Sequence, residues 1–182
     1  MTRTLIYGGT FDPVHNGHVE VPRAAMLHLE FDRVLYVPAH IAPLKDESPT
    51  TASHRLAMLR LALTDSTWAE ISTIELDRKG TSYTIDTIEA LRNDNDTIRL
   101  LIGADQWQQF QSWHRWEEII ERADPAVMPR AGSGISDADV LPITPITAKS
   151  ANIRDLVHNG ASIDHLVDHQ VVAYITQHNL YR

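Results

Sequence analysis

The chain has 182 residues, no cysteine and a formal charge of −8 at pH 7. Its 43% of hydrophobic residues can build a core, so we expect one domain, 1–182. The absence of cysteine excludes disulfides, thiolate metal sites and a cysteine nucleophile. The negative charge argues against a nucleic-acid partner, and it means that an anionic ligand would need a locally positive pocket.

The sequence contains no uninterrupted apolar run of about 18 residues. The short apolar run at the N-terminus ends at Gly8 and Gly9, too early for the hydrophobic region of a signal peptide. We therefore expect a cytoplasmic protein with no membrane partner. The sequence is compatible with a monomer and with a homodimer.

Short apolar and β-branched runs alternate with segments of helical periodicity along the chain. Strands are predicted at residues 4–7, 34–37, 98–102 and 126–128, and helices at 17–29, 53–63, 82–91, 113–122, 150–157 and 168–178. Ser53 is the predicted N-cap of the second helix. This alternation predicts an α/β fold: a single-domain, Rossmann-like, doubly wound and mostly parallel sheet with helices on both faces. Ligands of such folds bind beyond the carboxyl ends of the strands.

The strongest chemical signal is the segment 8–18, GGTFDPVHNGH, where the first strand turns into the first helix. Glycines let a phosphate approach the backbone closely, and a helix start offers unpaired N–H groups with a positive dipole. The segment lacks the Lys-Ser/Thr ending of a P-loop and the glycine spacing of a dinucleotide fingerprint. Instead it adds His15 and His18, which can donate hydrogen bonds to phosphate oxygens or can simply cap the helix.

Segment 8–18 resembles the GGTFDPxHxGH signature of bacterial nicotinate-nucleotide adenylyltransferases, a family of the HxGH nucleotidyltransferase superfamily. Residues 75–87 resemble the family's ElxRxGxSYTxDT block, and residues 38–45 its proline-flanked loop with a phosphate-binding lysine. Residues 103–105, 113–116 and 148–154 resemble its GxD, WxxW and ISSTxIR elements. The last match is incomplete, because Lys149 and Ala151 stand where the family has Ser and Thr. The resemblance extends from residue 5 to 154, and the ending 171–181 is also similar.

The resemblance implies adenylyl transfer from ATP to nicotinate mononucleotide, giving nicotinate adenine dinucleotide (deamido-NAD) and pyrophosphate, a step of NAD biosynthesis. The attack is in line and forms no covalent enzyme intermediate, since the attacking phosphate is already anionic. ATP and nicotinate mononucleotide are the expected partners. Mg²⁺ is expected to accompany ATP, and no protein ligand of the metal is assigned.

The resemblance also assigns roles to residues. The catalytic residues would be His18, His15 and Lys45. The ATP site would comprise Gly8, Gly9, Thr10, Phe11, His15, His18, Gly103, Asp105, Ser150, Ile153 and Arg154. Nicotinate mononucleotide would be bound by Lys45, Tyr83, Thr84 and Trp116, with Thr84 at a helix start that receives the carboxylate and Trp116 stacked on the pyridine ring.

Several of these residues also have a purely structural interpretation. Lys45 can be a solvated loop lysine, Ser82 and Thr84 can cap a helix, and Tyr83 can be a core residue. Trp113 and Trp116 share one face of the predicted helix 113–122, which also fits core packing.

Rival functions are a transferase that acts on phosphopantetheine, or on choline or glycerol phosphate with CTP, and a nucleotide-binding sensor without catalysis. A class I aminoacyl-tRNA synthetase is discarded, because so short and acidic a chain has no room for tRNA-binding domains. The helix start at Thr84 favours nicotinate over nicotinamide mononucleotide.

Overall fold

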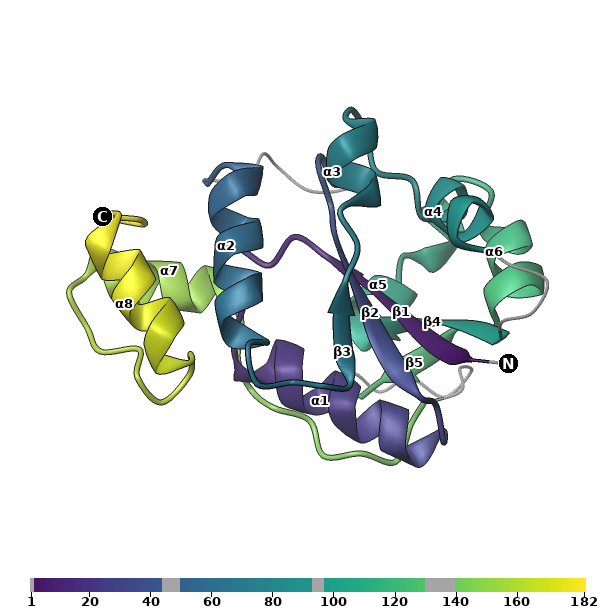
Figure 1. Cartoon of the computed structure of the whole chain (residues 1–182), viewed down its shortest axis with the longest axis horizontal. Coiled ribbons are helices and arrows are strands. Elements are labelled where there is room, and N and C mark those ends of the chain that lie inside the picture. Colours follow the sequence, from purple (N-terminus) through teal and green to yellow (C-terminus); the bar gives the residue numbers. More distant parts are fainter. Residues whose placement is uncertain (1, 44–49, 93–96, 130–139) are drawn as a thin grey trace.

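The computed structural model describes residues 2–43, 50–92, 97–129 and 140–182. Its centre is a sheet of five strands in the order β3-β2-β1-β4-β5, in which all neighbours are parallel (Figure 1). The strands are β1 (Arg3–Gly9), β2 (Arg33–Pro38), β3 (Ala69–Ile71), β4 (Thr97–Gly103) and β5 (Ala126–Met128). The predicted Rossmann-like α/β fold is confirmed.

The helices of the described chain cover both faces of this sheet. They are α1 (Asn16–His28), α2 (Ala52–Ala62), α3 (Ile74–Arg78), α4 (Thr84–Leu91), α5 (Ala104–Trp107), α6 (Trp116–Ala123), α7 (Ser150–His158) and α8 (His169–Gln177), with a 3₁₀ turn η1 (Phe110–Ser112). Because side chains alternate along a strand, Leu5 and Tyr7 pack into one core with α1, α2, α7 and α8. Ile6 packs into a second core with α4 and α6.

Local structure differs from the sequence prediction at several points, of which the following bear on the site. The helix predicted at 113–122 begins only at Trp116, because Arg115 adopts the left-handed conformation (φ 54°) and Trp113 lies before it. The two tryptophans therefore do not share a helix face. The N-cap of α2 is Thr51 and not Ser53. Strand β3 and helix α3 were not predicted, because both are short and neither has a clear period.

The strand order places a crevice beside β1. The chain crosses from β1 to β2 on one side, and β4 pairs with β1 on the other side, so the direction of winding changes between β1 and β4. Loops leaving neighbouring strands on opposite faces open a ligand site at their carboxyl ends. The segments at this point are the loop from Gly9 to α1 and the step from Gly103 into α5. Within the described residues, no helix is long and apolar enough to cross a membrane.

Candidate active site

The glycine loop between β1 and α1 is built around the ring of Phe11. Phe11 has a positive φ of 54° and is 2% exposed. Its ring lies against Tyr7, Tyr36 and His18, with centroids 5.7, 5.9 and 5.2 Å away. A Cβ on Gly9 would come within 2.8 Å of this ring. The second glycine of the motif is therefore needed for packing inside the protein.

The histidines of the loop form a stacked pair at the start of α1. The ring centroids of His15 and His18 are 3.7 Å apart at 22°. The N–H of His15, the N-cap residue, donates to Nδ1 of His18 over 3.3 Å. A neutral His18 that accepts at Nδ1 carries its proton on Nε2, so it is preset as a donor. A Cβ on Gly17 would lie 3.1 Å from the His15 ring, so Gly17 leaves the room for this pair.

A cavity of about 930 Å³ opens in front of this pair. Its wall combines the glycine loop, the step from β4 into α5 and the start of α7. It includes the predicted residues Gly8, Gly9, Thr10, Phe11, His15, His18, Gly103, Asp105, Ser150 and Arg154, together with Lys149. The side chains of two histidines, a lysine and an arginine thus concentrate positive or hydrogen-donating groups in an acidic chain.

Helix α7 is tied directly to the glycine loop. Ser150 Oγ donates to the carbonyl of Pro13 over 2.9 Å, and Arg154 Nη1 donates to the carbonyl of Asp12 over 2.8 Å. The N-cap Lys149 makes no side-chain capping hydrogen bond, so the first N–H groups of α7 keep their capacity to bind an anion. Arg154 also lines the larger cavity, and its guanidinium has further N–H groups besides the one that binds Asp12.

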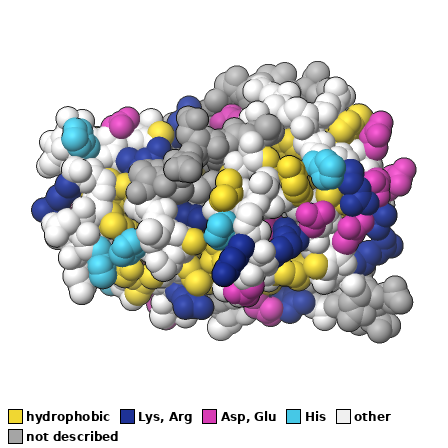
Figure 2. All heavy atoms as spheres, turned by 90° about the horizontal axis from the view of Figure 1, so that it is seen from above, with side chains coloured by type: hydrophobic (Ala, Val, Ile, Leu, Met, Phe, Trp, Pro, Cys, Tyr) yellow, Lys and Arg dark blue, Asp and Glu magenta, His cyan; other side chains and the backbone are white. Residues whose placement is uncertain are grey.

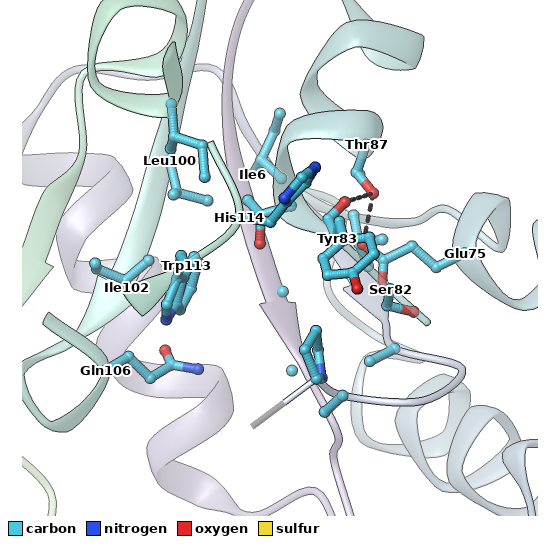
Figure 3. A pocket seen from close by; sticks show the side chains of 18 of the residues that line it. Ile6, Glu75, Ser82, Tyr83, Thr87, Leu100, Ile102, Gln106, Trp113 and His114 are labelled. Atoms are coloured by element: carbon cyan, nitrogen blue, oxygen red, sulfur yellow. Dashed lines mark hydrogen bonds between the residues drawn. The ribbon is translucent and has the colours of Figure 1, made fainter. Parts of the chain in front are cut away.

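A second cavity, of about 430 Å³, lies on the α4 side of β1. Figure 3 shows Trp113 and Tyr83 on opposite sides of it, with Ile6, Leu100 and Ile102 forming the apolar wall. This is a slot with aromatic groups on both flanks. Thr84, the first residue of α4, also lines it, and the N-cap Tyr83 makes no side-chain capping hydrogen bond.

Trp113 lines this slot, whereas Trp116, which the sequence interpretation had stacked on the pyridine ring, lines neither cavity. The ring of Trp116 lies edge-on to Phe110 with centroids 6.4 Å apart. The left-handed conformation of Arg115 separates Trp113 from helix α6, which begins at Trp116. Next to Trp113, His114 packs against Tyr83 with ring centroids 4.7 Å apart.

A buried carboxyl group also faces the slot. Glu75 is 7% exposed, and its Oε1 accepts a 2.6 Å hydrogen bond from the hydroxyl of Thr87. Burial raises the pKa of Glu75, and the hydrogen bonds from Thr87 and Ser82 oppose this only in part. The carboxyl group of Glu75 therefore binds its proton more tightly than that of an exposed glutamate does.

An ion-pair network supports the Trp113 side of the slot from outside. Arg115 binds Glu89 of α4 over 2.8 Å and Glu118 of α6 over 2.6 Å, and Arg122 binds Glu118 over 3.0 Å. Figure 2 shows such charges of both signs side by side at the α4–α6 end of the molecule. Hydrogen bonds from Arg115 lower the pKa of Glu118 to about 2. The network therefore stays ionised over any ordinary pH.

The two cavities meet at the glycine loop. Six residues line both of them: Gly8, Gly9, Thr10, Pro43, Gln106 and Gln109. A ligand in the slot and a ligand in the larger cavity can therefore touch each other over the end of β1. The sequence interpretation missed Gln106 and Gln109, for which the only available signal is their position just after β4.

Two of the predicted residues that the structure describes, Trp116 and Ile153, do not line either cavity. Ile153 is fully buried in the core with α1 and α8, so its side chain contributes packing. Lys45 lies outside the described residues. Among the residues that the structure describes, no group of three or more His, Asp or Glu side chains is placed to hold a metal ion.

The parallel sheet and the glycine loop with cavities at its carboxyl edge are typical of a Rossmann-like nucleotide-binding fold. Residues 6–173 match the cytidylyltransferase-like family. The chain is 35% identical to a probable nicotinate-nucleotide adenylyltransferase of Bordetella avium, over all of this chain and 99% of that one. It is 36% identical to one of Roseiflexus sp., covering 97% and 96% of the two chains. It belongs to the cytidylyltransferase-like family and, within it, to the nicotinate-nucleotide adenylyltransferases.

Solved structures share the fold. The nicotinic acid mononucleotide adenylyltransferase of Plasmodium falciparum, complexed with NaAD, superimposes with a TM-score of 0.83 at 20% identity, covering 100% of this chain and 98% of that one. A putative nicotinate-nucleotide adenylyltransferase of Vibrio parahaemolyticus gives 0.75 at 23% identity, covering 100% and 96%. At these low sequence identities, the similarity to the solved structures establishes the fold alone.

Proposed function

We propose that this chain transfers the adenylyl group of ATP to the 5′-phosphate of nicotinate mononucleotide and releases pyrophosphate. The observation that carries the proposal is the meeting of the two cavities at Gly8, Gly9 and Thr10. One cavity has the donors that a triphosphate needs, and the other has the aromatic flanks that suit a flat ring. The reacting phosphates then come together where the cavities join.

On the ATP side, His18 would donate from Nε2 to the α-phosphate as charge builds there in the transition state. The hydrogen bond from the His15 N–H supports this role, because it selects the tautomer that can donate. Arg154, Lys149 and the first N–H groups of α7 would hold the β- and γ-phosphates. Ser150 donates to Pro13, so we assign its hydroxyl to holding α7 against the loop.

On the acceptor side, the pyridine ring would lie between Trp113 and Tyr83. Its carboxylate would accept from N–H groups at the start of α4, near Thr84, where the helix dipole favours an anion. The raised pKa of Glu75 supports nicotinate as the substrate, because a carboxyl group that ionises less readily repels the nicotinate carboxylate less. Figure 3 places Glu75 and Tyr83 on the same side of the slot.

The chemistry needs no nucleophile from the protein. An oxygen of the mononucleotide phosphate forms a bond to the α-phosphorus of ATP, and the bond from that phosphorus to pyrophosphate breaks. Position and charge stabilisation supply the catalysis. Lys45, which lies outside the described residues, keeps the phosphate-neutralising role that the family resemblance implies. Mg²⁺ bound to the phosphates of ATP would offset part of their charge. Among the described residues no group of three or more His, Asp or Glu side chains is placed to hold a metal ion, so no residue is assigned to it.

The experiment is pyrophosphate release from ATP and Mg²⁺ with nicotinate mononucleotide, nicotinamide mononucleotide or phosphopantetheine offered separately. We expect strong preference for the nicotinate form. Activity with phosphopantetheine alone would contradict the assignment of the aromatic slot. Pyrophosphate release with none of the three, although ATP binds, would contradict catalysis and favour a sensor.

A further inference from the structure

The chain ends beside its own glycine loop. After α8 the backbone turns through Asn179 and Tyr181, which both have positive φ (51° and 63°). The N–H of Leu180 donates to the carbonyl of Ile175 over 3.1 Å and fixes this turn. The turn directs the phenol of Tyr181 inward, where its hydroxyl donates to Oδ1 of Asp12. Figure 1 shows α8 and the C-terminus next to α2, against which α8 packs.

Asp12, the acceptor, is a buried anion inside the glycine loop. It is 2% exposed. Thr50 donates to it twice, from its N–H over 3.3 Å and from its hydroxyl over 2.5 Å. A carboxylate removed from water depends on such donors, and Tyr181 supplies one more. Burial and the nearby Asp12 raise the pKa of Tyr181, so the phenol remains protonated and remains a donor.

The loop is therefore held from three separate elements. Arg154 of α7 donates to the carbonyl of Asp12 over 2.8 Å. Arg55 of α2, which is 1% exposed, donates from Nη1 to the carbonyl of Thr10 over 2.8 Å. Tyr181 holds the side chain of Asp12 from the C-terminal tail. Tyr181 itself does not line either cavity. Its hydroxyl contacts Asp12 and, over 3.9 Å, the sulfur of Met58, so Asp12 is its hydrogen-bonded link to the glycine loop.

We propose that Tyr181 is a positioning residue for adenylyl transfer, because through Asp12 it fixes the loop that carries His15 and His18. The histidine pair is stacked and preset by one backbone hydrogen bond, and it begins only three residues after Asp12. A small displacement of the loop would move both rings away from the α-phosphate. The inference rests on the proposed function, and its first test is independent of activity.

That first test is hydrogen exchange of the full chain without substrates, on wild type, Tyr181→Phe and Tyr174→Phe. Tyr174 is a matched control, since it is a second tyrosine of the C-terminal region whose hydroxyl contacts Nδ1 of His54 over 2.9 Å, away from Asp12. We expect faster exchange in residues 9–18 for Tyr181→Phe only. Equal protection of this loop in all three proteins would overturn the inference, whatever the chain catalyses.

The second test is kinetic. We expect Tyr181→Phe to lower kcat about tenfold with KM values for both substrates within about twofold, since misplaced donors act mainly on the transition state. Tyr174→Phe should keep kcat within about twofold. In an Asp12→Ala background, which lacks the acceptor oxygens, the Tyr181→Phe change should cost little more, because both substitutions remove the same contact. Independent, multiplying losses would overturn the route through Asp12, and an inactive wild type would instead refute the proposed function.

Discussion

His18 combines a preset tautomer with a place on the wall of the larger cavity. If its Nε2–H stabilises charge at the α-phosphate, His18→Ala should lower kcat about 10²- to 10³-fold and change the KM for ATP far less. His28→Ala is a suitable control, because His28 lies on the same helix in its last turn. Steady-state kinetics with ATP varied would measure both. A large rise in KM with little loss of kcat would assign His18 to ground-state binding instead.

The first two glycines of the motif serve different purposes, which makes them separable. A Cβ on Gly8 meets only the Val37 carbonyl oxygen at 4.0 Å, whereas a Cβ on Gly9 meets the Phe11 ring at 2.8 Å. We expect Gly9→Ala to destabilise the fold by about 1–3 kcal/mol through overpacking. Gly8→Ala should keep the wild-type Tm and lose activity, because its Cβ would occupy space that both cavities share. Gly9 lines both cavities as well, so Gly9→Ala should lose activity and Tm together, and thermal melts with turnover assays on both variants would show that only Gly9→Ala lowers the Tm.

Glu75 should make stability depend on pH. Its pKa is raised in the folded protein, so its contribution to stability is fully present below the ordinary glutamate pKa and is lost as pH rises through the folded value. Glu75→Gln stays neutral and can still accept from Thr87. The Tm of the variant minus that of wild type should therefore grow as pH rises, by about 3–5 °C for each ~1.4 kcal/mol of stability that the wild type loses. A difference that shrinks with rising pH would show that Glu75 ionises more easily when folded.

At the scale of elements, the network of Arg115, Glu89 and Glu118 connects α4 with the segment that carries Trp113. We expect Arg115→Ala to raise the KM for nicotinate mononucleotide with little change in the KM for ATP, because only the slot loses support. The network is exposed, so salt should screen it. In wild type the KM for the acceptor should rise with salt toward that of the variant. Equal salt dependence of this KM in both proteins would show that the network does not support acceptor binding.

Elements with strong local signals were predictable from the sequence. Strand β1, the glycine loop and α1 follow from apolar runs and glycines that act over a few residues. The position of Trp113 could not be predicted, because it depends on the left-handed conformation of Arg115, which arginine rarely adopts. Glu75, Gln106 and Gln109 were missed as cavity residues because their place depends on how distant segments pack around β1.

For the whole molecule, the strand order positions the two cavities on either side of β1 and makes them share Gly8, Gly9 and Thr10. The winding of the sheet was predictable from the alternation of elements. The fixing of the loop by Tyr181 was not, because it joins residues 169 positions apart. The strand order and the Tyr181–Asp12 contact both exist only in the assembled fold, and both affect how the two substrates are brought together.

Because the two cavities share residues at the end of β1, we can predict the kinetic mechanism of the reaction. Because the acceptor phosphate attacks ATP directly over the end of β1, both substrates must be bound before any bond breaks. Initial rates with both substrates varied should give intersecting double-reciprocal lines. The chain should also not exchange labelled pyrophosphate into ATP when the acceptor is absent. Parallel lines together with such exchange would require an adenylylated enzyme, and that result would contradict direct transfer between the two cavities.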